Sequence, residues 1–208
     1  MENYVGNEED RYRIEIKSSR GVLEYFDFTE SVENNIYEEK EWSLNFLIRA
    51  FVEEGQEVAI IKGTLFDENK LEECGLDIVE AADYIAQDEN SAAYWLSQFE
   101  GYRDDGGDEW IWEDSYSGYI ATFYVYEEYR HKGIAKYLFS NIHKLLKYSL
   151  NISVRCLCIY PQPQNPVTWK NISDDEMMKT MIQVIERNGF VKIGNEGFYA
   201  RSYDLAGL

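Results

Sequence analysis

A short basic turn, Arg130-His-Lys-Gly133-Ile-Ala135, is the part of this chain best suited to binding an anion. It joins an apolar segment to a segment with helical spacing, so its amides stand at the start of a predicted helix. The first amides of a helix have no partner within it, and the helix dipole is positive there. Gly133 would let a phosphate approach the backbone, while Arg130 and Lys132 would add positive charge. The turn therefore predicts a phosphate site.

The elements on either side of the turn must hold it in place. Tyr119 to Val125 form an apolar and aromatic run, which predicts a strand buried on both faces. After the turn, apolar residues recur with helical spacing and share one predicted face: Ile134, Tyr137, Leu138, Ile142, Leu145 and Leu146. Basic turns of this kind also join strands to helices in many α/β proteins that bind no ligand there. The turn alone leaves both interpretations open.

With its flanking elements, the turn resembles the acyl-CoA pyrophosphate loop of the GNAT N-acetyltransferase superfamily, which reads Arg/Gln-x-x-Gly-x-Gly/Ala. Val125, followed by Glu127-Glu128-Tyr129, resembles the family's V-x-x-x-x-R-G-x-G entry to that loop. Farther on, Ile185-Glu-Arg-Asn-Gly-Phe190 resembles its Y-E-K-x-G-F helix end. The resemblance extends from Gly118 to about Tyr203, and the order of these motifs makes it specific.

The resemblance implies an α/β (α+β) fold, with a mixed, mostly antiparallel twisted sheet flanked by helices. We expect a single domain over residues 1–208, with the acyl-CoA-binding core in 118–203. Residues 1–43 would form a divergent β-rich extension. GNAT proteins join their third and fourth strands by a few residues, so residues 67–108, with two stretches of helical spacing, would be a helical insertion before the cofactor strand.

Alternating hydrophobicity predicts two hairpins before the insertion. Residues 11–17 and 22–28 would form the first hairpin. Residues 44–52 and 57–66 form the clearer one and resemble the second and third strands of the GNAT sheet. Residues 109–113 predict a short strand after the insertion.

The C-terminal part continues with alternating strands and helices. Residues 152–160 predict a strand that is apolar on both faces and ends at a proline-rich segment. A helix follows, with one stripe assigned to the core (Met178, Met181, Ile182 and Ile185), and Gly189 would end it in a left-handed conformation. Residues 190–193 and 198–203 would close the sheet.

The resemblance implies transfer of an acetyl group from acetyl-CoA, as co-substrate, to a primary amine. In GNAT enzymes the fourth and fifth strands splay apart, and the pantetheine arm inserts between them. The backbone of Phe123, Tyr124 and Val125 would then bind the arm. The remaining implied cofactor-binding residues form the turn, where amides hold the pyrophosphate and side chains add charge: Arg130, His131, Lys132, Gly133, Ile134 and Ala135.

Such a reaction takes one proton from the attacking ammonium and gives one to the leaving thiolate. The family's usual side chains for these steps are missing, because its Tyr falls on Ile185 and its fourth-strand acid falls near Tyr119. Tyr160 could serve as the acid, and Glu113 or Asp114 as the base. Each has a structural alternative, since Tyr160 could pack under the proline-rich segment and the two carboxylates could belong to a solvated turn.

The formal charge of −19 is concentrated in the first part of the chain. Residues 1–117 contain 31 acidic and 9 basic residues, whereas residues 118–208 contain 8 acidic and 11 basic ones. The mildly basic part suits a polyphosphate ligand. The acidic part would repel nucleic acid and attract a cationic acceptor, such as a small amine, a polyamine or a lysine-rich protein. The acidity could equally serve solubility alone.

Two functions therefore stay open. The first is an N-acetyltransferase that acts on a small-molecule or protein amine. The alternative is a catalytically silent GNAT-fold protein that binds or regulates a partner through its acidic surface.

The remaining features concern compartment, metals and assembly. No apolar run approaches the ~20 residues that span a bilayer, and the acidic N-terminus is unlike a signal peptide. We expect a cytoplasmic protein without membrane contact. Three cysteines and two histidines are too few and too scattered for a zinc site, so no metal is expected. The final strands of GNAT proteins often pair between subunits, which makes a homodimer one candidate assembly.

Overall fold

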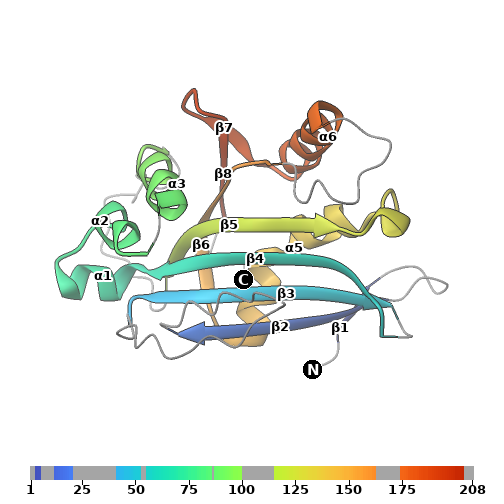
Figure 1. Ribbon diagram of the computed structural model, residues 1–208. Helices are drawn as coiled ribbons and strands as arrows, with labels where there is room; N and C mark the ends of the chain where they lie inside the picture. Colours follow the sequence, from blue (N-terminus) through green and yellow to red (C-terminus); the bar gives the residue numbers. More distant parts are fainter. Residues whose placement is uncertain are drawn as a thin grey trace, which may run out of the picture.

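A computed structural model describes residues 3–5, 12–20, 41–52, 55–85, 87–99, 115–162 and 174–203 (Figure 1). Its centre is one eight-stranded sheet with the order β1-β2-β3-β4-β5-β6-β8-β7. The strands are β1 (Asn3–Val5), β2 (Tyr12–Arg20), β3 (Ser43–Val52), β4 (Glu57–Asp67), β5 (Ser115–Val125), β6 (Ser153–Ile159), β7 (Val191–Ile193) and β8 (Phe198–Ser202).

The sheet is mixed and mostly antiparallel, which confirms the predicted fold class. Its parallel pair is β5 and β6, and all other neighbouring strands run antiparallel. Parallel neighbours need a long crossover connection. Helix α5 (Ile134–Leu150) supplies it, directly after the basic turn.

Helices cover both faces of the sheet. The buried apolar residues form two hydrophobic clusters. In Figure 1, α5 lies behind the strands, and its buried stripe packs on that face through residues such as Leu138, Ile142 and Leu146. The opposite face is covered by α1 (Glu68–Cys74), α2 (Ile78–Asp83) and α3 (Gln87–Ser97). Helix α6 (Asp174–Arg187) packs beside α5. In the part of the chain that the structure describes, no helix is long and apolar enough to cross a membrane.

Helices α1, α2 and α3 occupy the segment in which helical spacing predicted helices. Asp67 caps α1 by accepting from the Lys70 amide, and Asp77 caps α2 in a reciprocal capping box with Glu80. Gly75 ends α1 in the left-handed conformation. The assignment of these helices to an insertion of residues 67–108, like the other domain divisions, stays a prediction.

The N-terminal strands differ in part from the expected hairpins. The 44–52 and 57–66 hairpin is confirmed as β3 and β4. Strand β2 pairs with β3 along its whole length and with β1 at its start. The expected strands at 22–28 and 109–113 lie outside the described residues.

A polar cluster anchors α1 to the ends of β5 and β6. The Tyr116 hydroxyl donates to the buried Asp67 carboxylate at 2.9 Å. Glu68 accepts from the hydroxyls of Ser115, at 3.0 Å, and Ser117, and it pairs with Arg155 at 3.1 Å. The Glu68 side chain is 16% exposed and that of Arg155 22%, so this pair is largely shielded from water.

We expect Glu68→Ala to lower the free energy of unfolding by about 2 kcal/mol, because it takes the carboxylate from a shielded guanidinium and two hydroxyls. Urea denaturation measures the loss. Glu41→Ala is the matched control, since Glu41 pairs with Lys70 at 3.2 Å while its own side chain is 80% exposed. Exposed pairs of this kind contribute little, so no measurable change is expected there. Equal losses in the two variants would contradict the assignment of Glu68 as an anchor.

His143, on α5, predicts a pH dependence of stability. It is 9% exposed, stacks on Tyr203 with ring centroids 4.6 Å apart, and its Nδ1 has no hydrogen-bond partner among the described residues. Burial, followed by the charges of Arg201 and Lys144, lowers the pKa of His143 to about 4. Its unfolded value is about 6.5. Protons therefore bind the unfolded chain more readily, and this contribution to stability is intact above about pH 6.5 and lost as the pH falls toward 4.

The expected result is that His143→Phe loses less of its melting temperature between about pH 7 and pH 4.5 than the unchanged protein does. Calorimetry at a series of pH values measures both curves. Parallel curves would show that His143 does not carry the effect.

Candidate functional site

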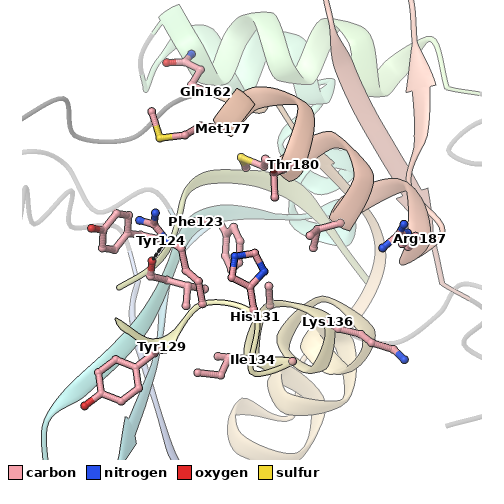
Figure 2. A pocket seen from close by; sticks show the side chains of 16 residues that line it. Phe123, Tyr124, Tyr129, His131, Ile134, Lys136, Gln162, Met177, Thr180 and Arg187 are labelled. Carbon is pink, nitrogen blue, oxygen red and sulfur yellow. Dashed lines mark hydrogen bonds between the residues drawn. The ribbon is translucent and has the colours of Figure 1, made fainter. Parts of the chain in front are cut away.

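A cavity of about 450 Å³ lies where β5, the basic turn, the start of α5 and helix α6 meet (Figure 2). Its apolar lining comes from Phe123 and Val125 on β5, from the first turn of α5, and from α6. The residues that line it are Phe123, Tyr124, Val125, Tyr129, Arg130, His131, Gly133, Ile134, Ala135, Lys136, Gln162, Met177, Thr180, Met181, Val184 and Arg187.

The cavity exists because β5 and β6 part. Their parallel register ends at Ile120 and Ile159, where β6 ends, but β5 continues along β4 to Val125. Next to this point, the β4–β5 register shifts so that Ala121 is an extra residue in β5. Such a bulge bends the strand that carries it, and it lies where β5 leaves β6.

This parting corrects one expectation from the sequence. The run from Tyr119 to Val125 was expected to be buried on both faces, but only the first half of β5, up to Ile120, is fully buried. Residues 121–125 are half-buried because β6 no longer covers that edge. An apolar run does not reveal where its neighbouring strand ends.

The direction of the β5 main chain distinguishes the three residues expected to bind the pantetheine arm. The Tyr126 amide donates to Val58 of β4 at 3.0 Å. Because antiparallel pairing alternates, the main-chain groups of Tyr124 also face β4, while those of Phe123 and Val125 face the parting side. The Val125 carbonyl accepts from Arg130 Nε at 3.0 Å. Phe123 is therefore the best placed of the three to pair with an extended ligand.

The basic turn has the geometry of an anion site. After a 3-10 turn, η1 (Glu127–Tyr129), the Arg130 amide donates to the Glu127 carbonyl at 3.2 Å. His131 and Gly133 then adopt left-handed conformations, with φ of 62° and 81°. Within the described residues, no acceptor is recorded for the amides from His131 to Lys136, and the first turn of α5 has no acidic residue or side-chain cap. Consecutive amides of this kind at a helix start attract an anion.

Two phenol groups hold the turn against the β3–β4 hairpin. The Tyr126 hydroxyl donates to Glu57 at 2.9 Å, and the Tyr129 hydroxyl donates to Gln56 at 2.9 Å. Glu57 also pairs with Arg49 at 3.2 Å. Burial and the hydrogen bond to Glu57 raise the pKa of Tyr126 to about 12, so its phenol stays protonated and donates at neutral pH. These contacts fix both ends of η1.

The cationic side chains are arranged differently from the expectation. Besides its bond to Val125, the Arg130 guanidinium lies 5.8 Å from the centroid of the Tyr124 ring. Lys132 lies over the Tyr129 ring at 5.1 Å and is not part of the cavity lining. Lys136 and Arg187 line the cavity instead and point to the same side of it in Figure 2. The recorded lining residues include no carboxylate.

Helix α6 supplies a wall of the cavity that the sequence did not indicate. Its stripe was assigned to the core, and Ile185 is indeed fully buried. Met181 packs against the core and also lines the cavity, together with Met177 and Thr180. The sequence pattern of α6 does not predict that this helix lies opposite β5, because their proximity depends on the tertiary fold.

Of the expected catalytic residues, the structure describes Tyr160, which is not among the residues that line the cavity. The Tyr160 ring packs on Phe198, with centroids 5.0 Å apart, and lies next to Gly197. It is partly buried and packs against the core on the side of α1–α3. Glu113 and Asp114 lie outside the described residues. A catalytic role for any of the three stays a prediction.

No protein-family model matches the sequence, and no curated protein matches it either. Two crystal structures of NAA60 from Arabidopsis thaliana are similar to this structure. The complex with acetyl-CoA is 19% identical, with 78% of this chain and 77% of that chain covered and a TM-score of 0.37. The complex with a bisubstrate analogue is 14% identical, with 81% and 80% covered and a TM-score of 0.36. Similarity at this level describes the general fold and carries no evidence on the ligand.

Proposed function

We propose that this protein is an N-acyltransferase that transfers an acetyl group from acetyl-CoA to a primary amine. One observation carries the proposal: a row of amides from His131 to Lys136, without recorded acceptors, opens into an apolar cavity where β5 and β6 part. The amides suit a diphosphate, and the apolar cavity suits an extended arm that carries a thiol. The GNAT motifs of the sequence fall on this same place.

The residues present fit the parts of acetyl-CoA. The amides of His131 to Ala135 would hold the diphosphate, with Lys136 and Arg187 as nearby cations. The main chain of Phe123 would pair with the pantetheine arm at the edge that β6 leaves open. Arg130 would keep the β5 end and the turn together through Val125. When bound, acetyl-CoA supplies an activated thioester.

In the transfer, the amine nitrogen bonds to the acetyl carbon and the carbon–sulfur bond breaks. The ammonium gives up one proton before attack, and the leaving sulfur takes one. Since the recorded cavity lining has no carboxylate, holding the two reactants together would supply much of the rate. Tyr160 as the acid and Glu113 or Asp114 as the base remain our proposed proton carriers, and a cationic amine, on a small molecule or a protein, remains the proposed acceptor.

The second candidate is a GNAT-fold protein that binds acetyl-CoA, or a partner, without catalysis. Fully buried Ile185 at the family's tyrosine position and the lack of a recorded acid in the cavity favour it. Under this proposal the acidic part of the chain binds a basic partner.

Two measurements separate these functions. Acetyl-CoA at about 100 times its Kd should stabilise the protein by about 2.7 kcal/mol in either case, which a thermal shift detects. Release of free CoA with a panel of primary amines, including polyamines and lysine peptides, is expected only of the enzyme. Stabilisation without CoA release would support the binding protein. Absence of both effects in folded protein would refute the acetyl-CoA site.

A further inference from the structure

Asn188, directly after α6, connects this helix to α5 and β8. Its side-chain Oδ1 accepts from the Ser140 hydroxyl of α5 at 2.6 Å. Its main-chain carbonyl accepts from Arg201 Nη1 of β8 at 2.6 Å, and the same Nη1 donates to the Phe139 carbonyl of α5 at 3.4 Å. Its Nδ2 donates to the Val184 carbonyl within α6 at 2.7 Å. The end of α6 is therefore fixed in direction as well as in position.

The backbone at this helix end does not require an asparagine. The left-handed residue that follows the helix is Gly189, with φ of 82°. Asn188 is only 7% exposed, and a buried amide costs free energy unless its polar atoms are bonded. Both Oδ1 and Nδ2 have partners. The contribution of this side chain is thus the connection between α5 and α6.

The same helix forms a wall of the cavity. Met177, Met181 and Val184 line the cavity with apolar side chains, and two of them, Met181 and Val184, also pack against the core. Figure 2 shows Met177 toward one end of α6 and Arg187 toward the other. Apolar contacts have no preferred direction. The hydrogen bonds at Asn188 therefore constrain the tilt of the helix more closely than the apolar packing does.

A small change of tilt at Asn188 has a large effect at the far end of α6. At a rise of 1.5 Å per residue, the helix from Met177 to Asn188 is roughly 16 Å long. A tilt of about 10° at Asn188 would move Met177 by about 3 Å. Misplacement of about 1 Å by a distant mutation can slow an enzyme by about 100-fold. The orientation of α6 is thus a sensitive property of the cavity.

We propose that Asn188 is a positioning residue for the cavity. By fixing the end of α6 to α5 and β8, it sets the distance between α6 and β5, and so the affinity for a ligand held between them. Asn188 is not among the residues that line the cavity, so it acts through α6. The inference rests on the proposed function only for the identity of the ligand.

The first test needs no ligand. Three of the four methionines of the chain lie on α6, so methyl NMR of the full chain labelled at methionine reports on this wall. Asn188→Ala loses the bonds to Ser140 and Val184, and the methyl signals of α6 should shift as the helix tilts relative to β5. Glu68→Ala is the control, because it is also expected to destabilise the protein but acts on α1, at the opposite face of the sheet. It should leave the methionine signals in place.

Calorimetric titration with CoA measures the effect on binding. Asn188→Ala should bind CoA about tenfold more weakly, because two hydrogen bonds that hold the wall are lost. Ser140→Ala removes one of these bonds from the side of α5, and about threefold weaker binding is expected. This milder variant also tests the proposal if Asn188→Ala does not fold. Glu68→Ala should stay within about twofold of the unchanged protein, since its site is independent of α6.

CoA affinity of Asn188→Ala within about twofold of the unchanged protein would overturn the positioning role and leave the proposed function standing. Equal losses of affinity in Asn188→Ala and Glu68→Ala would also overturn it, because affinity would then follow stability alone. Absence of CoA binding by the unchanged protein would instead overturn the proposed function. In that case unshifted methyl signals in Asn188→Ala would overturn the role of Asn188 separately, and shifted signals would support it.

Discussion

Gly133→Val is expected to remove acetyl-CoA binding while α5 and the sheet stay folded. Gly133 has φ of 81°, and a β-branched residue is strongly disfavoured there. A Cβ would meet no atom within 4 Å, so the expected effect of the substitution comes from the backbone conformation. The turn must change conformation and point its amides elsewhere. Loss of two or more hydrogen bonds to charged oxygens predicts affinity at least about 100-fold weaker.

Gly75→Val is the matched control for this variant. Gly75 also has a positive φ, of 66°, and also has no atom within 4 Å of a built Cβ, but it ends α1 far from the turn in sequence. Both variants should lose similar stability, by about 2 kcal/mol, from the left-handed conformation. Only Gly133→Val should lose affinity in calorimetric titration. Equal affinities for the two variants would show that the turn does not bind the co-substrate.

Among the variants considered, Gly194→Val should lower the free energy of unfolding most, by about 4 kcal/mol. Gly194 has φ of 59°, in the turn between β7 and β8, and a Cβ there would overlap the Trp95 ring of α3. Trp95 also donates to Glu196 of the same turn at 2.9 Å. The loss combines the left-handed conformation with an overpacked contact. In a protein of this length, it corresponds to a melting temperature roughly 8–16 °C lower.

The same Gly75→Val variant isolates the contact with Trp95, because it shares the backbone cost without the overlap. In urea denaturation, Gly75→Val should lose about half as much free energy of unfolding as Gly194→Val. The double variant Trp95→Ala with Gly194→Val should lose less than the sum of its single changes, since the overlap disappears with the ring. Additive losses would mean that α3 does not rest on the β7–β8 turn.

The elements of the site could be predicted from the sequence because local physics fixes them. The apolar spacing after Gly133 determines α5, and glycine at positions 133 and 189 permits the left-handed conformations found there. The basic turn and the β3–β4 hairpin follow from patterns a few residues long, whereas the mixed sheet was expected from the GNAT resemblance. Eight of the nine residues that the GNAT resemblance implies for cofactor binding line one cavity, and only Lys132 is not among the lining residues.

Only the tertiary structure decided what surrounds that turn. The length of β6 relative to β5 opened the cavity, and the packing of α6 brought Thr180 and Arg187 to its wall. Lys132 lies over the Tyr129 ring, and Tyr160 packs on Phe198 against the core on the side of α1–α3. The shape of the cavity and the position of Tyr160 depend on contacts between residues far apart in the chain. The position of Lys132 depends on whether its ammonium group lies over the Tyr129 ring or in the cavity. Spacing along a sequence fixes which face of an element a residue occupies, but not what lies opposite that face.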